Sequence, residues 1–390
     1  MSRCQHQIRV LEDVELKERV VVLTPFEPSN IGGVERLVRE FSKRLSKEYD
    51  IRVICSGPSK YEYSNCVRTT VVKGYPFPHS LAPGLAPGLY GAVKAADPTI
   101  IYAHVYTSYV SYIVWKMKRY NRKVKVVFHT HYHDTGANFF NSIVRKFYDR
   151  TLGPRFLEQA DVIIANSNSE LRELRRDFGK DIPAFVVHGG VDVSNIRAAD
   201  RFELEKSIIP LLWVGRLETY KNPYFALETI AQLPEYFHLF VIGDGPERGG
   251  LESAVKRLGA EGRVHFLGKV SNHDLYSWYK TAHAFLNFSS SESFGLTCIE
   301  SLAAGTPVVA NQDGHGLSET ISRFPNYVRG CDVRRDTPKN VAALVEETCL
   351  LKPVSVDINE FDWNALADAV SDILSGRIST NVQVKALAPA

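Results

Sequence analysis

The sequence predicts an α/β protein with two doubly wound, Rossmann-like domains, and three observations lead to this prediction. Short apolar runs, typical of strands buried on both faces, alternate with segments whose apolar residues recur at helical spacing. The alternation comes in two series, separated by a polar stretch at 192–207. The chain has 390 residues, more than one ordinary hydrophobic core supports.

The first series opens with the apolar run "RVVVLTPF" (19–26), which predicts a buried strand. The next segment, 34–49, predicts a helix because its apolar residues lie on one face. Further strands are expected at 50–55, 99–104, 123–131, 161–167 and 184–190, and helices near 108–120 and 168–178. We therefore expect a first domain over 1–192, with a Pro- and Gly-rich loop at 75–88.

The second series predicts a second domain over 208–360. Its strands are expected at 208–215, 237–243, 263–268, 284–289 and 307–310, and its helices at 222–233, 247–258, 272–281 and 296–304. In such folds ligands bind at the carboxyl ends of the strands, and in two domains those ends can face one cleft. The tail 377–390 has no periodicity and is expected to be mobile.

Composition favours an ordinary globular protein of the cytoplasm. No run of about 18 apolar residues occurs, and the charged N-terminal segment is not typical of a signal peptide. The six cysteines form no CxxC pair, which argues against a structural zinc site and suits a reducing compartment. Residues 1–200 contain 29 Lys and Arg against 21 Asp and Glu, so the first half is basic.

The stretch "SESFGLTCIE" (291–300) lies between a predicted strand and a predicted helix. Gly295 lets the backbone approach a ligand closely, and a helix starting at Leu296 offers free N–H groups to a phosphate. Glu292 precedes the helix, and Glu300 lies just over one turn into it. Two carboxylates beside a phosphate could hold two sets of sugar hydroxyls, as in a nucleotide sugar. The alternative is a solvated Glu292 and a surface Glu300.

Two cations follow another strand of the second series, in "GRLETYKN" (215–222). Arg216 and Lys221 there could neutralise a diphosphate without a metal, or could be solvated loop charges. "SNIGGVER" (29–36) places a glycine turn at the end of the first strand, where it either faces the same cleft or simply shapes the connection. "IGDGPERGG" (242–250) does not match the dinucleotide fingerprint, which disfavours an oxidoreductase.

The segment "HTHYHD" (129–134) contains three histidines at alternating positions. If the chain is extended there, His129, His131 and His133 share one face and could bind zinc. The favoured interpretation is that one histidine points into the cleft while the others form local hydrogen bonds, with no metal.

Together these motifs resemble the retaining family 4 glycosyltransferases of GT-B fold, over roughly 19–376. The family's E-x7-E pattern is matched by Glu292 and Glu300 in "ESFGLTCIE". "GRLETYKN", "IGDGPE", "FLGKV", "AAGTPVVA", "SNIGGVER" and "NSNSE" match in the expected order. The segment 361–376 resembles the family's closing helix, which packs back on the first domain. Two departures are Asn222, where glycine is common, and "DGHGLSE" (313–319).

The resemblance implies a role for each of these residues. Glu292 would contact the donor sugar and Glu300 the ribose, while Arg216 and Lys221 would hold the diphosphate. The remaining donor contacts would come from Gly33, Val270, Phe294, Gly295 and Leu296. A histidine would lie near the reacting sugar, with His131 as first choice and His129 as second.

The resemblance therefore predicts a glycosyltransferase that uses a nucleotide-diphosphate sugar, UDP- or GDP-linked, with retention of configuration and no metal or cofactor. The acceptor would carry a hydroxyl on a small molecule, a glycan or a lipid-linked sugar. Alternatives are a GT-B epimerase or sugar phosphorylase, and a non-catalytic sugar-nucleotide binding protein. No binding to nucleic acid is expected.

Two basic segments of the first half raise the question of a membrane. "WKMKRYNRKVK" (115–125) interleaves six cations with apolar residues, and 141–156 adds Arg145, Lys146 and Arg150 among others. Such interleaving suits a helix on an anionic membrane surface, at the inner face of the membrane. A merely solvated basic face is the alternative.

Overall fold

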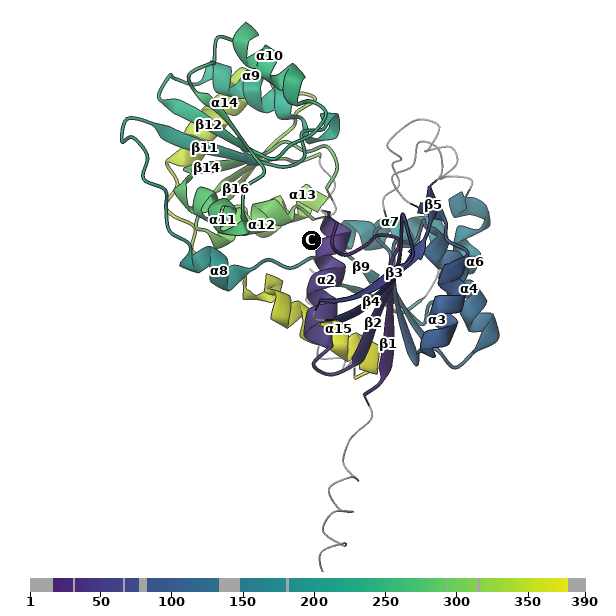
Figure 1. Cartoon of the computed structure of the whole chain (residues 1–390). Coiled ribbons are helices and arrows are strands. Elements are labelled where there is room, and N and C mark those ends of the chain that lie inside the picture. Colours follow the sequence, from purple (N-terminus) through teal and green to yellow (C-terminus); the bar gives the residue numbers. More distant parts are fainter. Residues whose placement is uncertain are drawn as a thin grey trace, which may run out of the picture. The chain divides into compact units, whose positions relative to one another are not determined.

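The computed structural model describes residues 17–30, 32–65, 67–76, 83–132, 148–179, 182–292, 294–313 and 316–377. These residues form two compact units, each built on a sheet with helices packed against it (Figure 1). The first unit comprises residues 17–164, 182–185 and 370–377, and the second comprises 165–179 and 186–369. The expected division lay at 192–207, whereas the second unit already includes 165–179 and the residues from 186 onward.

The first unit contains an eight-stranded sheet in the order β10-β9-β8-β7-β1-β2-β4-β3. Neighbouring strands from β9 to β4 pair in parallel, and β3 joins the edge in antiparallel orientation. The strands are β1 (Arg19–Leu23), β2 (Asp50–Gly57), β3 (Tyr61–Asn65), β4 (Val67–Lys73), β7 (Ile100–His104), β8 (Lys125–His129), β9 (Val162–Ala165) and β10 (Ala184–Val186). A separate short pair consists of β5 (Tyr75–Pro76) and β6 (Pro83–Leu85).

The described helices that follow these strands are α2 (Gly33–Leu45), α3 (Gly88–Ala96), α4 (Tyr109–Tyr120), α6 (Gly153–Leu157) and α7 (Asn168–Phe178). The helical periodicity of 34–49 is confirmed, because Leu37, Val38, Phe41 and Leu45 are all buried. Serine side chains fix two helix starts: Ser108 accepts from the Val110 amide and Ser167 from the Glu170 amide.

The second unit contains a six-stranded, all-parallel sheet in the order β13-β12-β11-β14-β15-β16. Its strands are β11 (Ile209–Val214), β12 (Phe237–Ile242), β13 (Val264–Gly268), β14 (Ala284–Asn287), β15 (Val308–Asn311) and β16 (Val328–Cys331). Its helices are α8 (Val193–Ala198), α9 (Pro223–Gln232), α10 (Arg248–Arg257), α11 (Asn272–Thr281), α12 (Leu296–Ala303), α13 (Gly316–Arg323) and α14 (Pro338–Cys349), with single 3-10 turns at Thr219–Lys221 and Asn359–Phe361. The last helix, α15 (Trp363–Ser375), begins in this unit and ends in the first.

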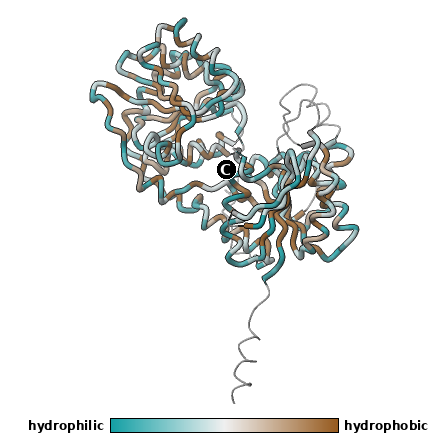
Figure 2. The backbone as a smooth tube through the Cα atoms, viewed as in Figure 1, coloured by the Kyte–Doolittle hydropathy of each residue, from teal (hydrophilic) through white to brown (hydrophobic). Residues whose placement is uncertain are grey.

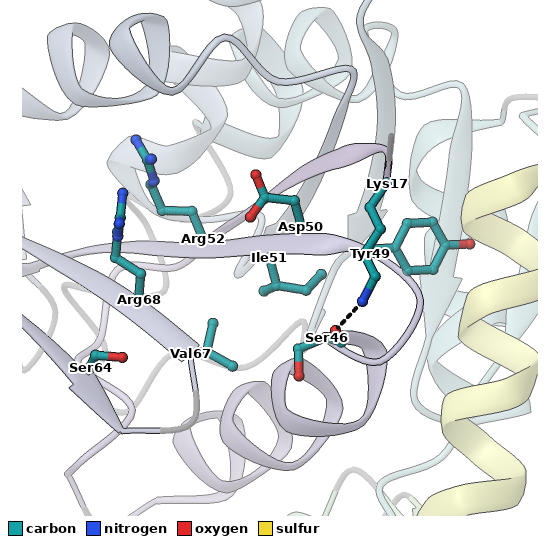
Figure 3. A pocket seen from close by; sticks show the side chains of 9 residues that line it. All are labelled: Lys17, Ser46, Tyr49, Asp50, Ile51, Arg52, Ser64, Val67 and Arg68. Atoms are coloured by element: carbon teal, nitrogen blue, oxygen red, sulfur yellow. Dashed lines mark hydrogen bonds between the residues drawn. The ribbon is translucent and has the colours of Figure 1, made fainter. Parts of the chain in front are cut away.

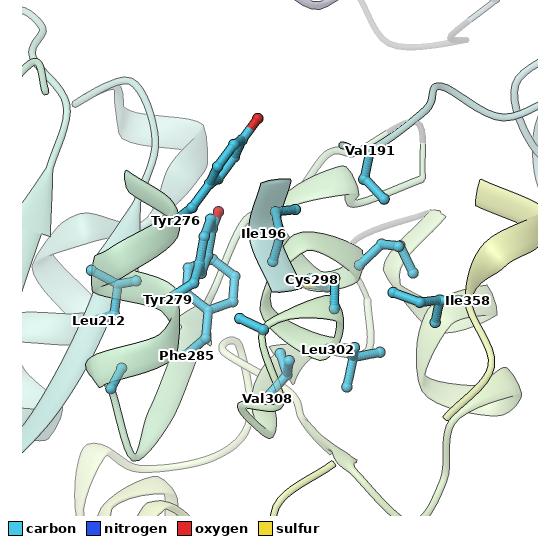
Figure 4. Close-up of a cluster of buried hydrophobic side chains, with 14 of the residues drawn as sticks. Val191, Ile196, Leu212, Tyr276, Tyr279, Phe285, Cys298, Leu302, Val308 and Ile358 are labelled. Atoms are coloured by element: carbon cyan, nitrogen blue, oxygen red, sulfur yellow. The ribbon is translucent and has the colours of Figure 1, made fainter. Parts of the chain in front are cut away.

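The central strands of both sheets are buried along nearly their whole length, as the patterns of β1, β7, β8, β9, β14 and β15 show. Figure 2 shows this as hydrophobic colour concentrated in the strands of each unit. In the second unit, one apolar cluster joins α8, α11 and α12 to one face of the sheet (Figure 4). Tyr279, Phe285, Cys298 and Leu302 belong to it, so α12 is fixed against the sheet by apolar contacts along its length.

Among the described residues, no helix is both long enough and apolar enough to cross a membrane. The described cysteines are largely buried, and burial raises the pKa of Cys55, Cys331 and Cys349 to about 12. Burial also raises the pKa of Cys298. None of these thiols is therefore expected to act as a nucleophile at neutral pH.

Candidate active site

Two loops of the second unit lie side by side because β11 and β14 are neighbours in the parallel sheet. The carboxyl ends of both strands meet at one edge, which places the turn after β11 next to the loop after β14. Hydrogen bonds join the two loops: the Ser290 amide and hydroxyl both donate to the Tyr220 carbonyl, at 2.8 and 3.0 Å. The Asn222 amide side chain donates to the Phe288 carbonyl at 2.9 Å.

Asn222 adopts the left-handed backbone conformation, with φ of 50°, at the position where the family commonly has glycine. Asparagine is one of the few other residues that tolerates this conformation. The departure therefore keeps the shape of the turn, and the Asn222 side chain adds a bond to the neighbouring loop.

Lys221 and Glu292 form an ion pair between the two loops, with each side chain largely withdrawn from solvent. Burial by itself lowers the pKa of Lys221, but the Glu292 carboxylate and then Tyr220 more than offset this, so the pKa is raised. Lys221 therefore keeps its positive charge at neutral pH. The structure brings together two of the residues that the sequence predicted for one site.

Arg216 is not part of this pair. It lies on the same turn after β11, where its guanidinium pairs with the Glu218 carboxylate and 61% of its side chain remains exposed. Its charge is thus accessible to an anionic ligand from solvent.

The loop after β14 ends at Gly295, which has φ of 81° and precedes the first residue of α12. A side chain at this position would lie 2.4 Å from the Leu317 side chain, so only glycine fits. The backbone N–H groups of Phe294, Gly295 and Leu296 donate to no acceptor in the part of the chain that the structure describes. Three N–H groups at the positive end of a helix favour an anion.

Glu300 is buried within α12 and is not the surface carboxylate of the alternative interpretation. The Tyr279 hydroxyl donates to its Oε2 at 3.1 Å, from the neighbouring helix α11. Glu292 precedes α12 and Glu300 lies within its second turn, as the sequence predicted. The two carboxylates are therefore fixed by different partners, Lys221 and Tyr279.

The Phe294 side chain points into the second unit and stacks on His188, with ring centroids 3.8 Å apart. His188 follows β10, and its Nδ1–H donates to the Asn166 carbonyl at 2.6 Å. His188 was not among the site residues predicted from the sequence. A clue to it in the sequence is the pair of glycines that follows it in "VVHGG". The structure shows why glycine is needed there: a side chain at Gly189 would meet Leu296, and one at Gly190 would meet Trp363.

A second missed contact joins α7 to α13. Asn168 donates through its backbone N–H and its side chain to the Glu319 carboxylate, at 3.0 and 2.7 Å. Glu319 is the glutamate of "DGHGLSE", and Asn168 belongs to "NSNSE". The two motifs therefore meet in one contact within the second unit. Gly314 and His315, which belong to "DGHGLSE", lie outside the described residues.

The remaining predicted donor residues lie at two other strand ends. Val270 follows β13 and packs, half-buried, against the apolar cluster of Figure 4. Gly33 is the exposed first residue of α2 in the first unit. A side chain added at Gly33 would meet nothing within 4 Å, so open space surrounds this helix start.

The predicted histidines lie at the end of β8 in the first unit. His131 has φ of 48°, so the chain leaves the strand there and the expected extended alternation of 129, 131 and 133 is wrong. His133 lies outside the described residues. A third histidine comes instead from β7: His104 pairs in register with His129, and its Nδ1 lies 3.2 Å from His131 Nε2.

The basic segment 115–125 does not form one helix. α4 ends at Tyr120, and Lys125 begins β8. The apolar face of α4 is buried, and Lys118 pairs with Asp161 at 2.7 Å. This segment therefore offers no apolar face to a membrane. In the second basic segment Arg150 is exposed, and Arg145 and Lys146 lie outside the described residues.

A pocket of about 600 Å³ lies at the opposite, amino-terminal edge of the first sheet (Figure 3). Arg52 and Arg68 are register partners on β2 and β4 and extend side by side in this pocket. The pocket is at the far end of the strands from the residues that the sequence predicted.

The burial of His188 makes stability depend on pH. Burial, followed by the charge of Arg323, lowers its pKa from 6.5 to about 4, and the bond to Asn166 only partly offsets this. Between these two values the unfolded chain binds a proton that the folded chain does not, so stability falls as pH falls through this window. The loss approaches roughly 3 kcal/mol when the window has been crossed.

We expect His188→Gln to reduce this acid-dependent loss, by about 2 kcal/mol between about pH 7 and about pH 5. Urea unfolding at both pH values measures it. The matched control is His273→Gln, because the His273 side chain is 76% exposed. Equal pH dependence in wild type and His188→Gln would contradict the buried, neutral His188.

Two family descriptions match consecutive parts of the chain. "Glycosyltransferase Family 4" matches residues 31–195, and "Glycosyl transferases group 1" matches residues 195–349. The second match contains Arg216, Lys221, Glu292 and Glu300.

Curated relatives resemble part of the chain. D-inositol 3-phosphate glycosyltransferase 2 of Catenulispora acidiphila is 35% identical over 248 residues, which cover 57% of this chain and 57% of that protein. D-inositol 3-phosphate glycosyltransferase of Mycobacterium tuberculosis (strain H37Ra) is 34% identical over 175 residues, covering 41% of this chain and 36% of that protein. The chain thus spans little more than half the length of the first relative and less of the second.

Solved structures match nearly the whole chain. Sucrose-phosphate synthase of Thermosynechococcus elongatus gives a TM-score of 0.76 at 20% identity, covering 92% of this chain and 99% of that one. Anabaena HepE, in complex with UDP, gives 0.73 at 18% identity, covering 92% and 100%. At such identities these likenesses establish the fold. From both family matches and the glutamate pair placed as described, the chain belongs to the family 4 glycosyltransferases and has the GT-B fold.

Proposed function

We propose that this protein transfers a sugar from a nucleotide-diphosphate sugar to an acceptor hydroxyl, with retention of configuration. One observation supports this most: at the start of α12, three backbone N–H groups have no acceptor among the described residues, and the charged pair Lys221 and Glu292 lies next to them. That site offers donors to a phosphate and a carboxylate to sugar hydroxyls within one loop. Its residues are those of the family's glutamate pattern.

In this proposal the diphosphate lies against the N–H groups of Phe294, Gly295 and Leu296, and Lys221 and Arg216 neutralise it. Glu292 accepts from hydroxyls of the donor sugar, and Glu300 accepts from the ribose. Val270 contacts the base through its backbone, and Gly33 leaves room for the diphosphate. His131, or His129 in its place, contacts the sugar that reacts.

The bond between the anomeric carbon and the diphosphate oxygen breaks as the acceptor oxygen bonds to the same face of that carbon. The acceptor's proton passes to the departing phosphate oxygen, so no protein nucleophile is required. The protein contributes by stabilising the charge that develops on the leaving diphosphate. An enzyme with a carboxylate nucleophile would instead form a covalent intermediate.

For the donor we propose a UDP-sugar first, because the structurally similar HepE is solved with UDP and UDP-glucose. GDP-sugars are the second choice. A thermal-shift screen separates them, since a ligand at about 100 times its dissociation constant adds about 2.7 kcal/mol of stability. For the acceptor, the names of the relatives make inositol 3-phosphate the first compound to test, before a glycan or lipid-linked sugar.

Substitutions of the two glutamates are expected to change different kinetic constants. Glu292→Gln should lower kcat about 100-fold with little change in donor KM, because its contact to the sugar strengthens in the transition state. Glu300→Gln should raise donor KM about 10-fold or more, because a charged hydrogen bond to the nucleotide weakens. Initial rates across donor concentrations measure both.

The matched control is Glu261→Gln, an exposed glutamate of the same unit, which should leave both constants unchanged. Thermal unfolding of each variant shows whether a loss of activity comes from a loss of folding. This check is most important for Glu300→Gln, because Glu300 is buried. Small, equal effects of both substitutions would sink these assignments.

Transfer is expected to continue in EDTA, because Lys221, Arg216 and the helix N–H groups supply the positive charge that a metal would otherwise provide. The measurement is product formation by enzyme dialysed against EDTA. Activity lost in EDTA and regained with Mg²⁺ or Mn²⁺ would overturn the metal-independent mechanism.

We further propose that the segment 141–156 contacts an anionic membrane, where a lipid-linked acceptor would lie. The support is its charge: Arg145, Lys146 and Arg150 alternate with apolar residues in the sequence. Reversing Arg145 and Lys146 to Glu should weaken binding to anionic vesicles roughly 30-fold, at about 1 kcal/mol per cation lost.

Co-sedimentation with anionic and neutral vesicles over a salt series measures this binding. Lys256→Glu with Arg257→Glu is the matched control, since these adjacent cations are exposed on α10 in the second unit. Equally weak binding to both vesicle types would favour a water-soluble acceptor.

A further inference from the structure

Three histidines of the first unit form a cluster that the proposed function uses only in part. His104 ends β7, His129 ends β8, and His131 follows two residues later. One ring nitrogen from each lies within 4.8 Å of the others. Because β7 and β8 are neighbouring parallel strands with His104 and His129 in register, the sheet itself brings these rings together.

The cluster is buried, and its hydrogen bonding is incomplete. His104 and His129 are fully buried, and His131 is half-buried. The contact between His104 Nδ1 and His131 Nε2 uses one proton, whichever ring donates it. His104 Nε2 then has no hydrogen-bond partner among the described residues. Nε2 is not the nitrogen that faces His131, so this unsatisfied atom marks the cluster as unusual without itself being the ligand of the ion proposed below.

The separation of the nitrogens suits a metal ion. His104 Nδ1 and His131 Nε2 are 3.2 Å apart. Two nitrogens bound to one tetrahedral zinc ion, at about 2.0–2.1 Å each, lie about 3.3 Å from one another. Neutral imidazole is the form of histidine that ligates a metal ion.

The third ligand is oriented by a neighbour. The Tyr102 hydroxyl lies 2.9 Å from His129 Nδ1, so this contact fixes the orientation of the His129 ring. Partners of this kind fix ring orientation in metal sites. The rings of His129 and His131 are within 10° of parallel, so one must turn before both nitrogens face one ion. His131 lies outside the strand and is the less buried of the two, so its ring turns more easily.

We propose that His104, His129 and His131 bind one divalent transition-metal ion of the Zn²⁺ class, leaving a fourth position for water or a ligand oxygen. Three nitrogen ligands with an open position form a recognised type of zinc site. This site does not depend on the proposed transfer activity. The effect of the ion on transfer, however, rests on the proposed function. A bound ion would occupy the histidine nitrogens that the proposed function assigns to the sugar, so Zn²⁺ should inhibit transfer.

The direct test is metal binding by the full chain, purified without a histidine tag. Equilibrium dialysis with Zn²⁺ should give one tightly bound ion per chain, and Co²⁺ should give the visible absorption of a tetrahedral site. His131→Gln should weaken binding more than about 100-fold, and Tyr102→Phe about 10- to 100-fold, as expected for loss of an orienting partner.

The matched control is the pair His238 and His265, whose Nδ1 and Nε2 are 3.0 Å apart in the second unit. Changing both to Gln removes an equally close pair that lacks a third histidine, and should leave the tight ion in place. Loss of the ion in this control, with none lost in His131→Gln, would overturn the site. Thermal unfolding of His131→Gln, the least buried position, checks that the variant is folded.

The activity arm distinguishes this proposal from the proposed function. Tight Zn²⁺ binding with inhibition of transfer supports both. Tight binding with unchanged transfer supports the metal site and removes these histidines from the reacting sugar. No tight ion in the wild-type chain overturns the metal site and leaves the proposed transfer untouched.

Discussion

The ion pair between Lys221 and Glu292 is the contact on which the candidate site depends. It joins two loops that follow neighbouring strands, and both charges are largely withdrawn from water. Removing one partner from such a pair leaves an uncompensated buried charge, which costs far more than the pair itself contributes. The hydrogen bonds from Ser290 to Tyr220 and from Asn222 to Phe288 therefore have a clear role, because they hold the loops where the charges meet. A sugar-nucleotide donor that binds here must interact with Lys221 and Glu292 while they are already paired with each other. Its phosphate charge therefore has to lie close to Lys221.

A second constraint is the packing of α12. Gly295 directly precedes its first residue. Apolar contacts then hold the helix along its length against the sheet and against α8 and α11. Glu300 is buried by the same packing that positions the helix. The N–H groups at the start of α12 thus belong to a rigid element, and little ordering is needed when an anion binds them. Rigid elements of this kind hold binding groups more accurately than free loops do.

Much of this could be predicted from the sequence, because the relevant signals are local. The apolar runs predicted the principal strands, and "SESFGLTCIE" predicted the helix start, its glycine and both glutamates. The partners of those residues could not be predicted, because they are distant in the chain. Nothing near Glu319 indicates Asn168, and nothing near Phe294 indicates His188. His104 was missed for the same reason: only the register of β7 with β8 places it beside His129. The turn at His131 was mispredicted because a left-handed residue after a strand has no apolar signature.

Asn222 has one more consequence, which concerns chemical ageing. Asparagine in an exposed turn degrades when the backbone nitrogen of the next residue attacks its side chain and forms a cyclic imide. Here the next residue is Pro223, whose nitrogen has no hydrogen to lose. The turn beside Lys221 therefore has the left-handed geometry that glycine would give, and also a side chain that binds the neighbouring loop. It does so without the slow deamidation that an Asn-Gly sequence would bring to the centre of the site.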